Sequence, residues 1–292
     1  MFAARNLRTA GVSPAPLAVH ALQAGFGRPF AGAARAALLV LAGVAGCGAA
    51  QGGSGGDQQS LAEYDIARDD FQKGRLREAL GHVETSLSMN GDNAEAAYLG
   101  AAIMLAFCAQ DQRSSDCRFD KAEKFARQAL DANPDLRDAK NLLGVVLVHE
   151  RRYDEAIAIL KPLANDILYG SPEKSWGNLG WAYFERGRTD EAIDALHRAV
   201  AAQPLFCVGH YRLGLAYEKK GELSAARESF TKAVDAKSPE CQRMQDAFDA
   251  RARVAIKQGL RDEARADLEK CRDLASSTAV GQRCAAQLKT MQ

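Results

Sequence analysis

The stretch Trp176-Gly-Asn-Leu179-Gly180-Trp-Ala-Tyr183 decides the fold, because its residue types return at a fixed spacing along the chain. The unit that begins with it continues with Gly187, Ala192, Leu196, Ala199 and Pro204. Leucine and glycine recur 34 positions further on, as Leu213-Gly214, followed by Tyr217, Gly221, Ala226, Phe230 and Ala233. Self-similarity at a period of this length predicts a stack of repeated structural units.

The same pattern extends in both directions from this stretch. Upstream units contain Leu143-Gly144 and Leu99-Gly100, and weaker units lie around Gly74 and Gly259. The pattern resembles the tetratricopeptide repeat (TPR), a helix-turn-helix unit. The resemblance implies an all-α superhelix, an α-solenoid of about six repeats, and residues 279–291 read as a C-terminal capping helix. In such units a small residue lies where two antiparallel helices cross, and each hairpin must stack on a neighbour to bury its apolar face.

The N-terminal residues predict an export signal and a flexible tether. Residues 1–56 contain four arginines and no acidic residue, and the apolar run 36–46 is too short to span a bilayer. The run ends in Val44-Ala45-Gly46-Cys47, which resembles the bacterial lipobox and implies lipidation of Cys47. We therefore expect a lipoprotein signal peptide over 1–46, a flexible tether over 47–59 and the TPR domain over 60–292. An ordinary cleaved signal peptide with a stray cysteine is the alternative.

Composition argues against several classes of function. The formal net charge is +1 with 26% charged residues, so no basic surface for nucleic acid is expected. No nucleophile, base and orienting group occur together, and the four histidines beyond residue 47 lie in separate predicted helices. We expect no enzymatic activity, no cofactor and no small-molecule substrate. The absence of a Cys-x-x-Cys pattern argues against a zinc site.

Six cysteines remain after Cys47, and an exported protein can keep them as disulfides. Cys108 and Cys117 flank an inserted loop, so a bond between them would close it. Cys271 and Cys284 would join the last repeat to the cap, although Cys271 could also pack as a free thiol. Cys207 and Cys241 begin the first helices of adjacent repeats, which pack about 10 Å apart, so their pairing needs the slack of inserted residues.

The TPR resemblance implies that the first helix of each repeat lines a concave face. The residues expected there form an apolar and aromatic stripe: Tyr98, Met104, Leu105, Leu142, Val145, Val148, Trp181, Phe184, Tyr211 and Leu215. The stripe predicts a groove for an extended or helical peptide. Alternatively, the inserted loop or a neighbouring repeat covers it. Lys174 and Asn178 partly resemble the basic clamp of co-chaperone TPRs, but the preceding repeat lacks the matching polar residues.

A lipobox, a short tether and six TPRs resemble the type IV pilus biogenesis lipoproteins of the PilF/PilW/Tgl type. The resemblance implies a periplasm-facing outer-membrane lipoprotein, held by its lipid anchor only, that acts as a protein-interaction scaffold. Its implied partner is an outer-membrane secretin, whose assembly it would support as a pilotin-like factor. The alternatives are an envelope adaptor that recruits peptidoglycan enzymes and an assembly factor for outer-membrane proteins.

Overall fold

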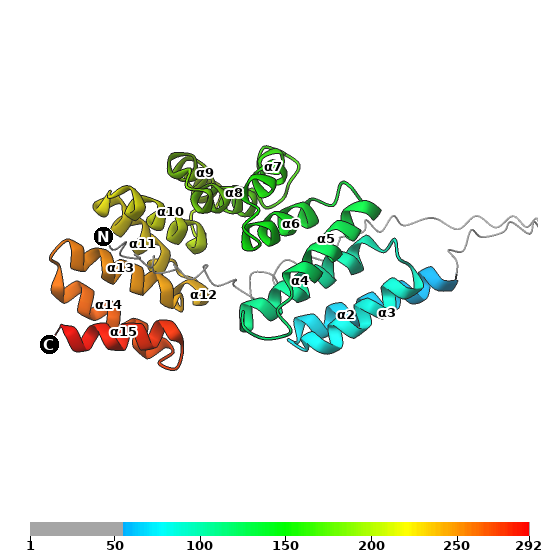
Figure 1. Cartoon of the computed structure of the whole chain (residues 1–292), viewed down its shortest axis with the longest axis horizontal. Helices are drawn as coiled ribbons and strands as arrows, with labels where there is room; N and C mark the ends of the chain where they lie inside the picture. Colours follow the sequence, from blue (N-terminus) through cyan, green and yellow to red (C-terminus); the bar gives the residue numbers. More distant parts are fainter. Residues whose placement is uncertain (1–54, 292) are drawn as a thin grey trace, which may run out of the picture.

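The computed structural model describes residues 55–291, and every regular element in this range is a helix (Figure 1). Cys47, the predicted signal peptide and residues 47–54 of the predicted tether lie outside the described residues. The helices pair as hairpins in chain order: α2 (Gly55–Gln72) with α3 (Leu76–Met89), α4 (Ala94–Gln110) with α5 (Phe119–Ala132), α6 (Arg137–His149) with α7 (Tyr153–Ala164), α8 (Pro172–Arg186) with α9 (Thr189–Ala202), α10 (Cys207–Lys220) with α11 (Leu223–Asp235), and α13 (Gln245–Lys257) with α14 (Arg261–Leu274). A single turn, α12 (Pro239–Gln242), precedes the last hairpin, and α15 (Ala279–Thr290) packs against α13 and α14. The predicted all-α superhelix of six hairpins and a cap is confirmed.

The first helix begins earlier than the sequence predicts. Helix α2 starts at Gly55, so residues 55–59, which we expected to be tether, form its first turns. A buried polar cluster fixes this end of the stack. The Ser60 hydroxyl lies 2.9 Å from that of Ser86 and accepts a hydrogen bond from the Asn93 side chain at 3.0 Å. Because Asn93 also caps α4, the cluster joins the first three helices.

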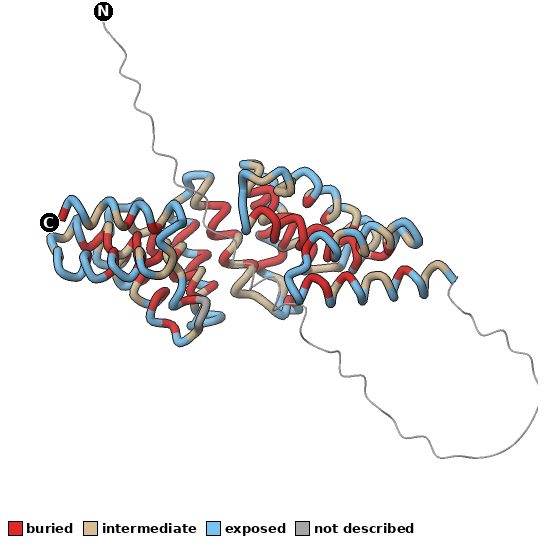
Figure 2. The backbone as a smooth tube through the Cα atoms, turned by 90° about the horizontal axis from the view of Figure 1, so that it is seen from below, coloured by how far each residue is buried: buried red, intermediate tan, exposed pale blue. Residues whose placement is uncertain are grey.

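The small residue of each repeat lies where its two helices cross, as the repeat pattern predicts. A Cβ atom placed on Gly180 would lie 2.6 Å from Cγ of Leu196, and one on Gly144 would lie 2.5 Å from Cγ of Leu160. Real Cβ atoms do not approach other carbon atoms this closely, so a larger residue could fit only if the leucine of the facing helix were displaced. The hairpins are therefore close-packed units, and buried positions recur in each of them (Figure 2).

The hairpins curve into an arch with α6 to α9 at its crown (Figure 1). The first helices of successive hairpins contact one another in the order α2, α4, α6, α8, α10 and α13. Helices that follow the shorter, inner path of a curved stack come closest together. The first helices therefore line the concave side, and the second helices α3, α5, α7, α9, α11 and α14 lie outside them.

Three disulfide bonds close the pairs that the sequence suggests. Cys108, on α4, bonds Cys117, just before α5, and so closes the inserted loop 111–118. Cys207 bonds Cys241 with 5.6 Å between their Cα atoms. Our placement of Cys241 at the start of a first helix is wrong, because it lies on the inserted turn α12, four residues before α13 begins. This insertion carries the cysteine to within bonding distance of α10.

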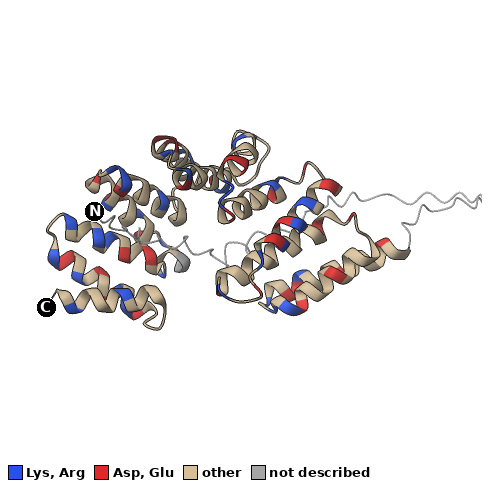
Figure 3. Cartoon of the chain, in the orientation of Figure 1, with Lys and Arg blue, Asp and Glu red and all other residues tan. Residues whose placement is uncertain are grey.

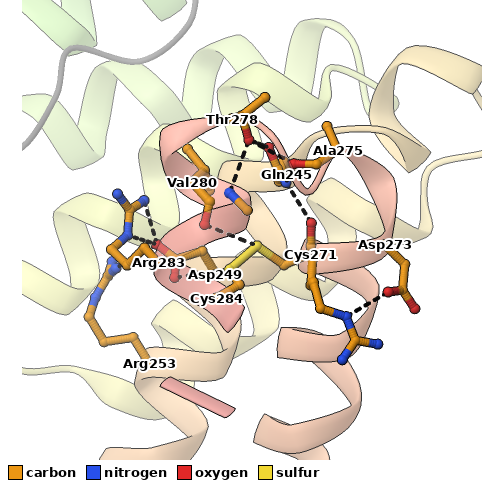
Figure 4. The surroundings of a disulfide bond; sticks show 12 residues. Gln245, Asp249, Arg253, Cys271, Asp273, Ala275, Thr278, Val280, Arg283 and Cys284 are labelled. Carbon is orange, nitrogen blue, oxygen red and sulfur yellow. Dashed lines mark hydrogen bonds and ion pairs between the residues drawn. A yellow bond between two sulfur atoms is a disulfide. The ribbon is translucent and has the colours of Figure 1, made fainter. Parts of the chain in front are cut away.

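The third disulfide fixes the cap. Cys271 on α14 and Cys284 on α15 are both fully buried, and the surrounding polar groups also join the cap to α13 (Figure 4). Gln245 on α13 donates its amide N–H to the carbonyls of Cys271 and Ala275 at the end of α14. Its Oε1 accepts a hydrogen bond at 2.6 Å from Thr278, the residue that caps α15. Arg283 on α15 donates to the buried Asp249 at 2.9 Å. The last hydrophobic edge of the stack is thus covered by a helix held through a covalent bond and two polar contacts.

Loss of the third disulfide should destabilise the cap through one shared interaction. We expect Cys271→Ser and Cys284→Ser each to lower the free energy of unfolding by about 3 kcal/mol, because the denatured chain regains the freedom of a loop. The double variant should be no worse than either single variant, since both changes break the same bond. Urea denaturation of the oxidised proteins measures this. Additive losses would show that the two cysteines stabilise the protein separately.

Candidate protein-binding face

The concave face of the superhelix is the candidate site, because it brings together side chains from α4, α6, α8, α10 and α13. All ten residues of the predicted apolar stripe lie on the first helices, as expected. They join one continuous hydrophobic cluster or pack against its edge.

The stripe is nevertheless covered for most of its length, which corrects the expectation of an open apolar groove. Seven of its ten residues are buried: Met104, Leu105, Leu142, Val148, Trp181, Tyr211 and Leu215. Tyr98, Val145 and Phe184 are partly exposed. The cause is the curvature of the stack, because neighbouring first helices lie close enough for each side chain to fill the space beside the next helix. The alternative in which neighbouring repeats cover the stripe describes these residues better.

Two aromatic residues mark the centre of this face. The rings of Trp181 and Phe184, on α8, stack with centroids 5.0 Å apart. Two cations of α10 lie over them. The Arg212 guanidinium is 5.3 Å from the centroid of the Trp181 ring, and the Lys219 ammonium is 4.6 Å from that of Phe184. The partly exposed surface here is therefore aromatic and cationic rather than purely apolar.

A polar ladder crosses three neighbouring first helices beside these rings. The Asn178 side chain on α8 donates to that of Asn141 on α6 at 3.1 Å. Its oxygen accepts a hydrogen bond from Nη1 of Arg212 on α10 at 2.9 Å. Sequence reasoning picked out Asn178 but missed Arg212. The repeat period contains the signal, since Arg212 lies 34 positions after Asn178 and so occupies the same place in the next repeat.

The charges at the ends of α6, α8 and α10 influence one another. Burial raises the pKa of Glu185 above its usual value, against the effects of Lys219, Arg212 and Arg151. Arg151 has a φ of 63°, where the corresponding residues of the next two repeats are glycines. This left-handed conformation costs a non-glycine residue about 1 kcal/mol, yet the chain places a cation there.

His149 packs at the same place, stacked on Phe119 with ring centroids 4.8 Å apart. Burial lowers its pKa to about 4, and the positive charge of Arg212 acts in the same direction. His149 is therefore neutral at neutral pH and adds no further charge to this part of the groove.

The opposite margin of the groove, near the starts of α4, α6 and α8, is acidic. Asp138 accepts a hydrogen bond from the buried Tyr169 hydroxyl at 3.0 Å, and burial together with the charge of Asp138 raises the pKa of Glu95. Burial, Asp138 and Glu95 also raise the pKa of Tyr98 far above its usual value. Elsewhere both signs of charge are spread over the helices (Figure 3). The concave face thus has an acidic margin and a cationic margin.

Two clefts lie at the inserted loop. They have volumes of about 320 and 460 Å³ and share Arg77, Phe107 and Asp116 in their walls. Arg77 on α3 pairs with Asp116 of the loop at 2.7 Å, so the loop is tied to the first hairpin as well as closed by its disulfide. Met104 of the stripe contributes to the wall of the smaller cleft.

The described residues carry neither a membrane-crossing helix nor a metal-binding cluster. No helix within 55–291 is long and apolar enough to span a bilayer. In the same range, His, Cys, Asp and Glu side chains form no group of three or more that could hold a metal ion.

Comparisons with known proteins define the class. Tetratricopeptide repeat models match residues 116–167 and 177–240, so the chain contains tetratricopeptide repeats, and its stacked hairpins have the TPR fold. A search of curated proteins found no significant match.

Among solved structures, the chain is similar to PilW, described as a widely conserved type IV pilus biogenesis factor. The TM-score is 0.65 at 22% identity, over 77% of this chain and 98% of PilW. It is also similar to PilF of Pseudomonas aeruginosa, with a TM-score of 0.60 at 18% identity, over 80% of this chain and all of PilF. The Cut9–Hcn1 assembly of the APC/C gives a TM-score of 0.65 at 15% identity, but only 43% of that chain is covered. At these identities the likeness shows the fold alone.

Truncation of Trp181 and of Phe184 should show which of the two side chains packs in the core and which lies at the surface. We expect Trp181→Ala to lower the free energy of unfolding by about 3–5 kcal/mol, because Trp181 is only 5% exposed and its loss leaves a cavity. Phe184→Ala should cost clearly less, since Phe184 is partly exposed. Urea denaturation of the two variants gives the comparison. Equal, small losses would mean that Trp181 faces an open groove after all.

The neutral, buried His149 should make stability depend on pH. The unfolded histidine binds a proton below a pKa of about 6.5, whereas the folded one does so only near 4. Folding therefore becomes less favourable as the pH falls from 6.5 to 4, by roughly 1–3 kcal/mol from this group. His149→Phe keeps a ring against Phe119 and should lose that part of the decrease. Urea denaturation at a series of pH values tests this, and identical pH profiles for the two proteins would contradict it.

Proposed function

We propose that this protein is an outer-membrane lipoprotein that acts as a TPR scaffold, a pilotin-like factor for secretin assembly in type IV pilus biogenesis. One observation supports this most: the superhelix matches PilW and PilF over 98% and 100% of their chains. The Cut9–Hcn1 match covers less than half of that chain. A match over nearly a whole protein supports a shared role better than a match to part of a longer one.

The N-terminal sequence supports the location in this proposal. Val44-Ala45-Gly46-Cys47 follows an apolar run of signal-peptide length, and lipidation of Cys47 would hold the domain at a membrane surface. Gly48 follows the cysteine, where an aspartate would favour retention in the inner membrane. The three disulfides suit an oxidising compartment such as the periplasm.

The concave face supports the scaffold role. It offers the partly exposed Phe184 ring, which stacks on the buried Trp181, together with hydrogen-bonded side-chain amides and two margins of opposite charge. Such a mixture suits recognition of a protein segment, because aromatics contribute contact area while amides and charges fix its register.

Deletion of the gene tests the function. We expect heat-stable secretin multimers to disappear from gels of the envelope fraction and to return with the wild-type gene. Cys47→Ala should give a folded protein that is not labelled by palmitate and does not restore the multimers, because the anchor is lost while every repeat stays intact.

Two outcomes would redirect the proposal. Unlabelled wild-type protein would contradict lipidation. Unchanged multimers, with murein hydrolases recovered in a pulldown of the wild-type protein, would favour the envelope adaptor instead. Recovery of unassembled outer-membrane proteins would favour an assembly factor.

A further inference from the structure

Two neighbouring loops of the superhelix hold large apolar side chains in water. Ile167 is 96% exposed and Leu168 73%, both in the loop that joins α7 to α8 at the crown of the arch (Figure 1). Leu205, in the loop between α9 and α10, is 58% exposed. Phe206 beside it lies against Gly177 in the first turns of α8, so both loops border the start of that helix.

The loop between α7 and α8 is built to keep its two aliphatic side chains outward. Asp166 accepts a hydrogen bond at 2.9 Å from the backbone N–H of Leu168 and pairs with Arg137 on α6 at 2.6 Å. Tyr169 is buried and donates its hydroxyl to Asp138, also on α6. Two contacts with α6 therefore fix the turn, and the aliphatic side chains between them project away from the protein.

These loops lie at the edge of the superhelix from which the predicted anchor leaves. The first helices run in the same direction, because the ladder from Asn141 through Asn178 to Arg212 joins positions near the starts of α6, α8 and α10. The loops that connect one hairpin to the next therefore share one edge with the start of α2. At that start, Asn90 of the loop between α3 and α4 donates to Asp57 at 3.0 Å.

The predicted anchor can reach a membrane along this edge. Cys47 precedes Gly55, where α2 begins, by eight residues, which span at most about 28 Å. Helix α8 is the third first helix after α2, a distance of roughly 30 Å at the usual spacing of packed helices. A bilayer that holds the lipid of Cys47 can therefore also meet the two exposed loops.

Charge distinguishes this edge from the opposite edge of the same hairpins. The loop 165–171 contains one charged residue, Asp166, which is paired, and the loop 203–206 contains none. The turns that follow α6, α8 and α10 at the opposite edge contain Glu150, Arg151, Arg152, Arg188 and Glu222. Transfer of charged groups into an apolar medium is costly, so only the first edge suits the boundary between lipid headgroups and acyl chains.

We propose that Ile167, Leu168 and Leu205 insert into the surface of the membrane that holds the lipid anchor, as a second contact beside Cys47. The proposal rests on the lipid anchor of the proposed function, but not on the secretin. It departs from the expectation that the lipid alone holds the protein at the membrane. The contact sets the orientation of the superhelix, because the charged turns of the opposite edge then face away from the bilayer.

A lipid surface is the occupant that these side chains fit best. They project from two loops, so a protein partner would need a matching pocket for each of them, whereas acyl chains rearrange around an inserted side chain. Three aliphatic side chains bind a membrane only weakly by themselves. The anchor holds them beside the bilayer at a high effective concentration, which makes a small apolar contact sufficient.

Quenching of tryptophan fluorescence by brominated lipids tests the contact. The lipidated protein, purified from membranes, is reconstituted into vesicles of phosphatidylethanolamine and phosphatidylglycerol whose acyl chains carry bromine, which quenches an indole only at close range. Ile167→Trp places an indole at the most exposed position of the loop. The wild-type protein, with Trp176 and Trp181, gives the background emission.

Ile256→Trp is the matched control. Ile256 is also an exposed isoleucine, but it lies at the end of α13, which faces the opposite edge. We expect the added indole of Ile167→Trp to be quenched, and to emit at shorter wavelength in vesicles without bromine than in the detergent-free protein without vesicles. The added indole of Ile256→Trp should not be quenched.

Two changes to this experiment show what drives the contact. Leu168→Asp together with Leu205→Asp, added to Ile167→Trp, should lower the ratio of inserted to free loop about 10- to 100-fold, because two apolar side chains no longer leave water. Replacement of phosphatidylglycerol by phosphatidylcholine should leave the quenching unchanged, since the loops carry no unpaired charge. Quenching that requires phosphatidylglycerol would assign the contact to charged groups elsewhere and overturn the proposal.

Equal quenching of the indoles added at the two edges, or quenching of neither, would also overturn it, and the exposed loops would then serve a protein partner. Palmitate labelling of the same sample separates this result from a failed anchor. A labelled but unquenched protein removes the second contact alone, whereas an unlabelled protein removes both. The assay contains no secretin, so it leaves the pilus proposal to its own test.

Thermal denaturation checks that each variant is folded. Ile167 and Leu168 lie mostly in solvent, so their exchange should leave the packing intact. If Leu205→Asp does not fold, Leu168→Asp alone carries that part of the test, with a smaller expected decrease in quenching.

Discussion

The close crossing of two helices within each hairpin is the constraint on which the rest of the structure depends. Gly144 and Gly180 leave no room for a Cβ atom, because Leu160 and Leu196 of the facing helices pack directly on them. The apolar side chains on the outside of each hairpin must be covered by the next hairpin. Stacking, curvature and the need for a cap all follow from that one contact, repeated along the chain.

The fold could be predicted from the sequence because its determinants are local and repeated. Leu179-Gly180 and Leu213-Gly214 each identify a crossing without reference to any distant residue. The insertions were harder, because an insertion has no counterpart in the repeat. For residues 237–244 the sequence indicated only that extra residues are present. The turn α12, which brings Cys241 to Cys207, depends on how these residues pack against α11.

The concave face could be predicted in composition but not in exposure. The sequence places the stripe on the first helices correctly, yet whether Leu105 or Trp181 meets solvent depends on the distance between neighbouring helices, which is set by the curvature of the whole stack. Arg212 was missed for a different reason. An arginine in a helix is ordinarily a solvated group, so the repeat position that Arg212 shares with Asn178 was passed over, and its contacts with Gly177 and Asn178 show that it lies in the groove.

The placement of the disulfides has a mechanical consequence under the proposed lipid anchor at Cys47. The three bonds lie in the second hairpin, between α10 and α12, and between α14 and the cap, so none joins α2 to α3. A pull between an anchor at Cys47 and a partner held in the groove would reach α2 first. The first hairpin is held to the stack by the Ser60–Ser86–Asn93 hydrogen bonds and the Arg77–Asp116 ion pair but by no disulfide, so it would separate before the hairpin behind it, whose loop Cys108–Cys117 closes. Extension of the first hairpin would increase the distance that the anchor can span, while the later hairpins, which contain the disulfides, would keep the groove in shape.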